Sequence, residues 1–251
     1  MVTKVKTRAE IEAMRTSGKM LATVLELLRN KIKVGMTTLE LADIAAAELK
    51  SMGATGPFLG YNGFPSVLCV SINDEVVHGI PSAKRIIAEG DIVSLDFGVQ
   101  YKGMITDGAI SVIVGKPRSA RDKDLLRYTE ASLQSGIAVL HNNVRAGDIG
   151  EAVQTVLDKH HYGIVRDLVG HGVGHELHED PNIPNYGRRN TGPFLQAGMT
   201  IAIEPMATLG TERVYLADDD WTILTYDGSR AAHFEHTILI TDDGAEVLTQ
   251  L

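Results

Sequence analysis

The spacing of apolar side chains predicts two amphipathic helices near the start of the chain. Residues 8–30 repeat apolar positions three and four apart, the spacing that gathers them on one helix face. A second helix is expected from Thr37 to about Gly53, because Thr37 and Glu40 have the spacing of a capping box. The apolar faces would carry Ile11, Met14, Leu21, Val24, Leu25 and Leu28 in the first helix, and Leu41, Ile44, Ala45 and Leu49 in the second.

Strands are predicted after these helices, and the same order of elements then returns. Short alternating or apolar runs predict strands at about 66–72, 92–100 and 105–114. Residues 121–142 predict a further helix, with one side formed by Leu125, Leu126, Leu133, Ile137 and Leu140. A capped helix follows it, and the later strands are predicted near 199–205, 212–216, 221–225 and 234–240.

This repetition indicates a duplicated unit. The stretch "NNVRAGDIGEAVQTVL" parallels "NKIKVGMTTLELADIA": Gly147 aligns with Gly35, and the pair Asp148/Glu151 aligns with the capping pair Thr37/Glu40. The halves, about 1–118 and 119–251, would be offset by about 112 positions. The alternative is that two capped helices look alike by chance. Two such halves predict a single α+β domain, with one curved sheet covered by helices on one side.

Composition restricts the class of protein. The 251 residues are 44% hydrophobic and 22% charged, which is typical of a globular domain with a sizeable core. The formal net charge of -8 argues against a nucleic-acid partner, which requires clustered lysine and arginine. The single cysteine, Cys69, fits a reducing compartment. No apolar run approaches the ~20 residues of a membrane span, and no secretory pattern is visible, so a cytoplasmic location is expected.

The segment "LVGHGVGHELHED", residues 168–180, combines three histidines with three glycines. Each glycine costs about 1 kcal/mol in a helix interior, so His171, His175 and His178 are not expected to form a helical stripe. An extended backbone is expected, with glycines where it bends or where another group approaches closely. A metal site, a flexible loop and a phosphate cradle all remain open on this segment alone.

Two aspartates are expected to face each other on a hairpin. Residues 91–115 read as two strands joined at "YKG", and a turn at Tyr101–Lys102 would put Asp96 directly opposite Asp107. Their Cβ atoms would then be ~5 Å apart on one face. Such carboxylates repel, so in a buried setting one takes up a proton or both share a cation. The simpler alternative is that one aspartate caps a turn while the other faces solvent.

Two glutamates make the cation interpretation stronger. Glu204 ends the apolar run "TIAIEPM", and Glu235 begins the apolar run "HFEHTILIT". Buried carboxylates are unusual unless they are paired or bound to a metal. Four carboxylates and one imidazole suit Mn, Fe, Co or a catalytic Zn, and two ions ~3.5–4 Å apart would balance the charge. Water between two such ions ionises near neutral pH, which predicts a hydrolase.

Across nearly its whole length, the chain resembles the type I methionine aminopeptidases, which have the pita-bread fold. The resemblance is carried by "GYNGFP", "SINDEVVHGIP", the Asp96/Asp107 hairpin, "GHGVGHELHEDPNIPNY", "GMTIAIEPM" and "DDWTILTYDGSRAAHFEHTILIT". It implies two divalent ions, Co, Mn, Fe or Zn. Asp96 would chelate one ion, His171 and Glu204 would hold the other, and Asp107 and Glu235 would bridge them.

The same resemblance implies the catalytic and substrate-binding roles. His178 would polarise the scissile carbonyl, His78 would contact the scissile nitrogen, and Glu204 would also shuttle the proton. The substrate's free α-amine would bind the ion of Asp96, which restricts attack to the first peptide bond. Plain core packing is the alternative for each member of the implied methionine pocket, which would be formed by Tyr61, Phe64, Cys69, Leu177 and Trp221, with Phe58 at its mouth.

The implied substrate is the N-terminal methionine of nascent polypeptides with a small second residue. The expected partners are these chains and, through a transient contact, the ribosome; a monomer is expected, with no membrane or nucleic-acid partner. The chain departs from the family pattern at His175, Leu177 and Gly108. His175 is expected to face solvent or to lie behind the ligands, and His233 to lie behind the metal site.

Three other functions are weighed against this one. An Xaa-Pro hydrolase of the same fold usually carries an additional N-terminal domain, whereas the first helix here begins by residue 8. A binding module that lost its metals is disfavoured because all five ligand positions are filled. A dinuclear phosphoesterase is disfavoured because no arginine or lysine stands beside the ligand motifs to hold phosphate.

Overall fold

The computed structural model describes residues 3–251, and its first two helices begin and end where the sequence predicts. Helix α1 (Arg8–Lys31) starts with a capping box between Thr7 and Glu10. Helix α2 (Thr38–Met52) starts with the predicted box between Thr37 and Glu40, and ends at Gly53, whose φ of 67° is left-handed. Both helices therefore follow from local caps and apolar spacing.

The second helix pair differs from the prediction at two ends. Helix α3 (Ala120–Ala138) ends before residue 142, and α4 (Ala146–Lys159) starts before Asp148. The predicted capping pair Asp148/Glu151 is wrong, because Asp148 is the third residue of the helix and accepts the N–H of Arg145 at 3.0 Å. Asp148 thus corresponds to Glu40 of the first half, and Arg145 corresponds to Thr37.

In the described part of the chain, the strands form one sheet of five strands, three sheets of three strands and one sheet of two strands, all antiparallel. One sheet has the order β1-β3-β4: Leu68–Ile72, Ile92–Tyr101 and Met104–Ile113. A second has the order β16-β15-β10-β7-β8: Ala245–Val247, His236–Ile240, Thr200–Ile203, Gly170–Gly172 and Glu179–Ile183. The others are β14-β11-β6 (Ala231–His233, Met206–Thr208, Gly163–Ile164), β12-β13-β2 (Val214–Leu216, Ile223–Thr225, Glu75–Val77) and β5-β9 (Val144–Arg145, Phe194–Leu195).

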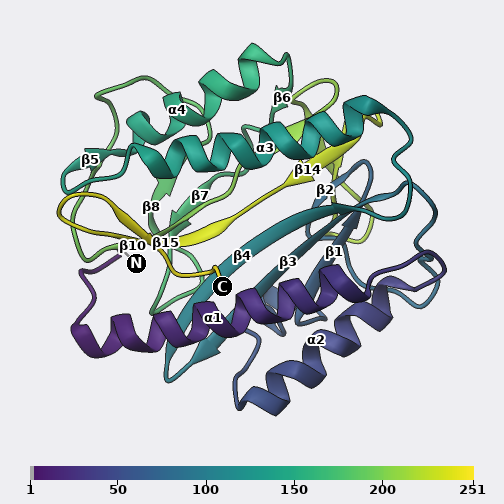
Figure 1. Ribbon diagram of the computed structural model, residues 1–251, viewed down its shortest axis with the longest axis horizontal. Helices are drawn as coiled ribbons and strands as arrows, with labels where there is room; N and C mark the ends of the chain where they lie inside the picture. The colour runs from purple at the N-terminus through teal and green to yellow at the C-terminus, as the bar shows by residue number, and fades with distance from the viewer. Residues whose placement is uncertain (1–2) are drawn as a thin grey trace.

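The helices lie across one side of the central strands. In Figure 1, α1 crosses in front of β3 and β4, while α3 crosses the strands of the second half. One buried cluster joins α1 and α2 to β1 and β3, and another joins α3 and α4 to β10 and β15. The predicted α+β class with helix-covered antiparallel sheet is confirmed. The division of one domain into halves at about residue 118 stays a prediction.

Strand β4 runs beside the start of β15, so that two segments far apart in the sequence meet. The N–H of Glu235 donates to the carbonyl of Ala109 at 2.9 Å. The Thr237 hydroxyl accepts from the N–H of Asp107 and donates to its carbonyl, both at 2.8 Å. These contacts fix the backbone of Asp107 against that of Glu235, although the residues are far apart in the sequence.

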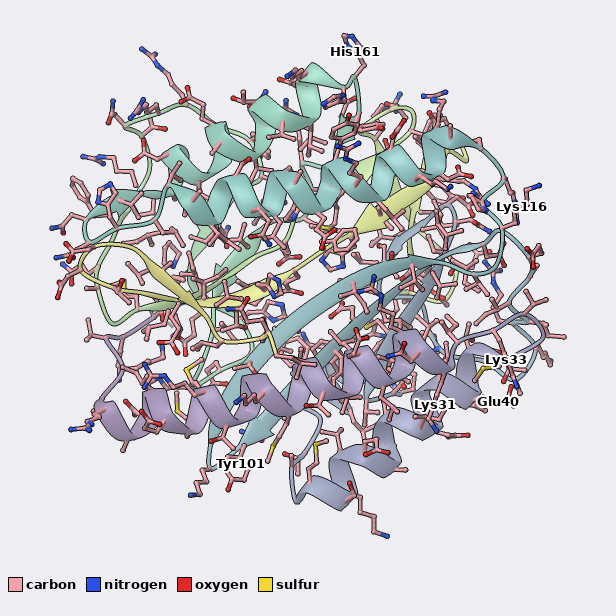
Figure 2. All side chains as sticks on the ribbon, in the orientation of Figure 1. Lys31, Lys33, Glu40, Tyr101, Lys116 and His161 are labelled. Carbon is pink, nitrogen blue, oxygen red and sulfur yellow. The ribbon has the colours of Figure 1, made fainter. Side chains whose placement is uncertain are left out.

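The predicted register of the β3–β4 hairpin is wrong by two residues. Asp96 pairs with Ala109, and Asp107 pairs with Gly98. The turn is formed by Lys102 and Gly103, both with positive φ (49° and 81°), which is the backbone of a two-residue type I′ turn. Figure 2 shows Tyr101 at the tip of this hairpin, at the edge of the molecule. Because the shift is even, Asp96 and Asp107 remain on the same face as diagonal neighbours.

Candidate active site

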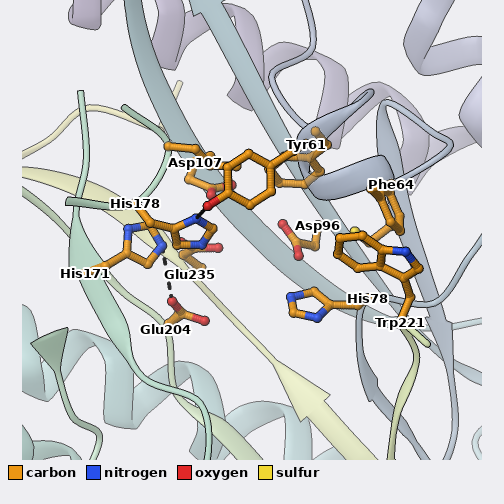
Figure 3. Close-up of a pocket in the computed structure, with 13 residues that line it drawn as sticks. Tyr61, Phe64, His78, Asp96, Asp107, His171, His178, Glu204, Trp221 and Glu235 are labelled. Carbon is orange, nitrogen blue, oxygen red and sulfur yellow. Dashed lines mark hydrogen bonds and ion pairs between the residues drawn. The ribbon is translucent and has the colours of Figure 1, made fainter. Parts of the chain in front are cut away.

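One cavity collects every site residue that the sequence predicts. It encloses about 530 Å³, including the space at its mouth, and Figure 3 shows charged groups on one side and aromatic rings on the other. The cavity is lined by Phe58, Tyr61, Phe64, Cys69, His78, Asp96, Asp107, His171, Leu177, His178, Glu204, Trp221 and Glu235. The structure therefore brings these residues together around one cavity.

Four carboxylates reach the cavity from both halves of the molecule. Asp96 and Asp107 come from the β3–β4 hairpin, Glu204 directly follows β10, and Glu235 directly precedes β15. Ligand atoms of Asp107, His171 and Glu235 all lie within 4.8 Å of one another. Oδ1 of Asp96 and Oε1 of Glu235 are buried without a hydrogen-bond partner among residues 3–251. Such oxygens are costly to bury unless a cation binds them.

The electrostatics of this cluster also call for a cation. Burial raises the pKa of Asp107 to about 7. Burial first, and then the charge of Asp107, raise the pKa of Asp96, Glu204 and Glu235 well above the ordinary values. No lysine or arginine lines the cavity within the described residues. Divalent ions would supply the missing positive charge, and oxygen-rich ligand sets with one imidazole suit them.

His171 is held with one ring nitrogen free for a ligand. Its Nδ1 lies 2.9 Å from the carbonyl of Gly172 and can donate to it, so Nε2 carries the lone pair. That Nε2 lies 3.5 Å from Oε1 of Glu204. Burial lowers the pKa of His171 to about 3, which keeps the imidazole neutral, the form that binds metals.

Two more histidines stand at the cavity without joining the carboxylate cluster. Nδ1 of His178 lies 2.9 Å from the hydroxyl of Tyr61, and its ring centre is 4.3 Å from that of His171. His78 follows β2 with a left-handed φ of 60°, a conformation that is strained for a residue with a side chain. The next residue, Gly79, donates its N–H to the hydroxyl of Ser71 at 3.0 Å, which holds this bend against β1.

The opposite wall of the cavity is apolar. Phe64 meets Trp221 edge to face, with ring centres 5.0 Å apart. Trp221 occupies a turn held by Asp219, whose carboxylate accepts the N–H groups of Trp221 and Thr222 at 2.9 and 2.8 Å. Burial, with the charge of Asp96 second, raises the pKa of Cys69 well above its ordinary value, so its thiol stays protonated and unreactive.

Two neighbouring histidines occupy positions that the sequence left open. The His175 side chain is 31% exposed, and its Nε2 is 2.8 Å from Oε1 of Glu10 on α1. Nε2 of the buried His233 lies 3.7 Å from Glu204 and 3.9 Å from Glu235, and neither ring nitrogen has a hydrogen-bond partner within residues 3–251. The sequence indicated that His233 lies near the carboxylates, because residues two apart on an extended backbone point to the same side and His233 precedes Glu235 by two.

Comparisons with known proteins agree with this geometry. The model of metallopeptidase family M24 matches residues 12–242. The chain is 45% identical to methionine aminopeptidase 1 of Bacillus subtilis over 98% of both chains, and 44% identical to the methionine aminopeptidase of Mycoplasma capricolum with the same coverage. The crystal structure of methionine aminopeptidase from Thermotoga maritima superposes with a TM-score of 0.98, at 44% identity and full coverage of both chains. A prolidase from Pyrococcus furiosus (23% identity, TM-score 0.79, 98% of this chain and 65% of that one) shares the fold alone.

Proposed function

The chain belongs to metallopeptidase family M24 and is a metalloaminopeptidase of the methionine aminopeptidase group, and on that premise we propose that it uses two divalent ions to remove N-terminal methionine from chains with a small second residue. One observation carries this proposal. Five potential ligands from distant parts of the chain converge on one cavity, and an apolar wall of suitable size for a thioether faces them.

The donor set supports two ions rather than one. We propose that Asp96 holds one ion, that His171 and Glu204 hold the other, and that Asp107 and Glu235 bridge them. The hairpin geometry favours this division, since Asp96 and Asp107 are diagonal neighbours on one face, and Asp107 is fixed beside Glu235. Mn, Fe, Co and Zn all fit these ligands; bound ions would supply Lewis acidity and an activated water.

The protein's own groups would orient the peptide and move the proton. If the Tyr61 hydroxyl donates to Nδ1 of His178, the Nε2–H of His178 is left to donate to the scissile carbonyl. His78, whose pKa burial lowers to about 4, is neutral and can contact the scissile nitrogen. Glu204, ionised once the ions are bound, would accept the proton of the attacking water and deliver it to the leaving amine.

The methionine side chain would occupy the apolar wall. Phe64, Trp221, Cys69 and Leu177 offer aromatic edges and a neutral thiol, and Phe58 closes the same cluster. Flexible thioethers make favourable contacts with aromatic rings at such sites. A longer or charged first residue would lose these contacts, which accounts for a preference for methionine.

The expected partners follow from the substrate. We propose nascent polypeptides as the source of N-terminal methionine, a transient contact with the ribosome, a monomeric protein and a cytoplasmic location. In the part of the chain that the structure describes, every helix is too short or too polar to cross a membrane.

The test is release of methionine from Met-Ala-Ser by protein loaded with Mn or Fe. Asp96→Asn and His171→Ala should each abolish turnover, while the exposed-site controls Asp43→Asn and His141→Ala should retain it. Metal analysis before each assay separates loss of ions from loss of chemistry. Full turnover by either site variant with two ions bound would contradict the proposal. Faster cleavage of an Xaa-Pro dipeptide than of Met-Ala would instead favour the prolidase-like activity.

A further inference from the structure

The first residues of the described chain are packed against the loop that carries the site histidines. We call residues 3–10 the N-terminal strap and residues 170–179 the histidine loop. The N–H of Thr3 donates to the carbonyl of Asp180 at 2.6 Å, and the N–H of Lys6 donates to that of Gly198 at 2.8 Å. These bonds place the strap alongside β7 and β8, the strands that bear His171 and Glu179.

Lys6 and Glu179 form a buried ion pair at the centre of this contact. Nζ of Lys6 lies 3.0 Å from Oε2 of Glu179, and the two side chains are 0% and 1% exposed. Nζ also donates to the Thr3 hydroxyl at 2.9 Å and to the carbonyl of Lys4 at 3.2 Å. All three protons of the ammonium group are thereby satisfied, which is what a buried lysine requires.

The other oxygen of Glu179 holds the histidine loop itself. Oε1 accepts the N–H of His175 at 2.7 Å and that of Glu176 at 3.1 Å. His178 directly precedes Glu179, and Glu179 pairs with Gly172 beside His171. A single carboxylate therefore links the strap to the backbone on which both cavity histidines stand.

Two of the three glycines of the histidine loop, Gly172 and Gly174, are explained by the same contact. A Cβ on Gly172 would lie 2.7 Å from Cβ of Thr3, and one on Gly174 would lie 2.4 Å from Cε of Lys6. The sequence predicted that another group approaches closely at these glycines, and the group observed is the chain's own strap. His175 adds a third connection through its 2.8 Å contact with Glu10 at the start of α1.

We propose that Lys6 and Glu179 are positioning residues for the reaction: through this buried pair, the strap sets the position of the histidine loop and hence of His171 and His178. The inference rests on the proposed function for the roles of those two histidines. Misplacement of a catalytic group by ~1 Å lowers turnover by up to about 100-fold. The apolar wall that binds methionine lies outside the contact except for Leu177, since Phe58, Phe64, Cys69 and Trp221 belong to other segments. Loss of the pair should therefore lower kcat much more than it changes KM.

The decisive variant is Lys6→Met combined with Glu179→Gln. It removes both buried charges together, and the glutamine oxygen can still accept the two loop N–H groups. In metal-free protein, hydrogen–deuterium exchange of peptides covering 170–179 should accelerate about tenfold or more, while the β3–β4 peptides stay unchanged. In metal-loaded protein, kcat for Met-Ala-Ser should fall at least tenfold, with KM within about twofold.

A matched control removes another ion pair of α1. Arg15→Gln with Glu246→Gln breaks the exposed contact between α1 and β16, and it should change neither loop exchange nor kcat. If the double variant does not fold, Thr3→Val removes only the hydroxyl beside Lys6 and should produce smaller changes of the same sign.

Wild-type exchange and kcat in the folded double variant would overturn the inference, as would equal changes in the control. A failure of the proposed function would give a distinguishable result. The wild-type protein would then not cleave Met-Ala-Ser, whereas hydrogen–deuterium exchange would still report the coupling between the N-terminal strap and the histidine loop.

Discussion

Replacing Tyr61 with phenylalanine removes a single hydroxyl from the cavity and tests how His178 works. That hydroxyl lies 2.9 Å from Nδ1 of His178. Tyr61 is 38% exposed, so the change leaves the core intact and should not affect folding. Without the hydroxyl, Nδ1 has lost its donor, and the imidazole can place its proton on either nitrogen. The form with Nε2–H facing the substrate carbonyl becomes less populated.

The size of the effect follows from the value of one neutral hydrogen bond. Such a bond contributes about 0.5–1.5 kcal/mol net. With about 1.36 kcal/mol for each factor of ten in rate, the variant should be about 2- to 13-fold slower. The loss should fall on kcat, because a donor to the carbonyl is needed most when negative charge develops there. KM should change little, since phenylalanine keeps the aromatic ring that lines the methionine pocket.

The assay is steady-state release of methionine from Met-Ala-Ser at fixed, measured metal content. Tyr226→Phe, which changes another exposed tyrosine, serves as the control and should have wild-type kinetics. Unchanged kcat in Tyr61→Phe would refute the assigned role of the hydroxyl. A rise in KM at constant kcat would show that Tyr61 acts by binding the side chain instead.

Four further predictions address the metal centre, the pocket and the fold. Metal uptake near pH 7 should release protons, because the carboxyl groups with raised pKa values must ionise to bind metal, and the pKa of Asp107 is about 7. Titration calorimetry in buffers of different ionisation enthalpy measures the number of protons released, and a value of zero would contradict the prediction. For the same reason, the metal-free protein should lose stability as the pH rises from about 4 through 7, because the unfolded chain ionises these carboxyl groups over that range while the folded protein keeps them protonated. The metal-loaded protein should not show this loss. Asp219→Ala should raise KM several-fold with a smaller change in kcat, because it frees the turn of Trp221; an unchanged KM would argue against Trp221 as part of the pocket. Gly79→Ala should lower Tm by more than about 4 °C and reduce kcat, since its Cβ would lie 2.3 Å from the carbonyl of Val70; a wild-type melting curve would contradict this.

The site residues could be predicted because burial conflicts with their chemistry. Glu204 and Glu235 interrupt apolar runs, and an ionised group within such a run needs a partner. The pairing face of Asp96 and Asp107 was also readable, since alternation along two strands fixes which side chains share a face. The register of the two strands could not be predicted, because it depends on where the hairpin turns. Lys102 adopts a left-handed φ at the turn, which its residue type does not indicate.

Contacts between distant segments were the features that the sequence did not reveal. The glycines at 172 and 174 indicated a close approach, but nothing in their neighbourhood identifies Thr3 and Lys6 as the approaching groups. The start of α4 was misplaced because an aspartate can cap a helix from its first position or reach back from its third, and both fit the local sequence around Asp148. Each of these outcomes is decided by tertiary packing rather than by spacing along the chain.

The central claim is that carboxylates from both halves hold a pair of ions, and anomalous X-ray diffraction at the manganese edge tests it most directly. In crystals grown with Mn²⁺, two anomalous peaks ~3.5–4 Å apart are expected, both within ligand distance of Asp107 and Glu235. A single peak, or two peaks away from these carboxylates, would contradict the claim.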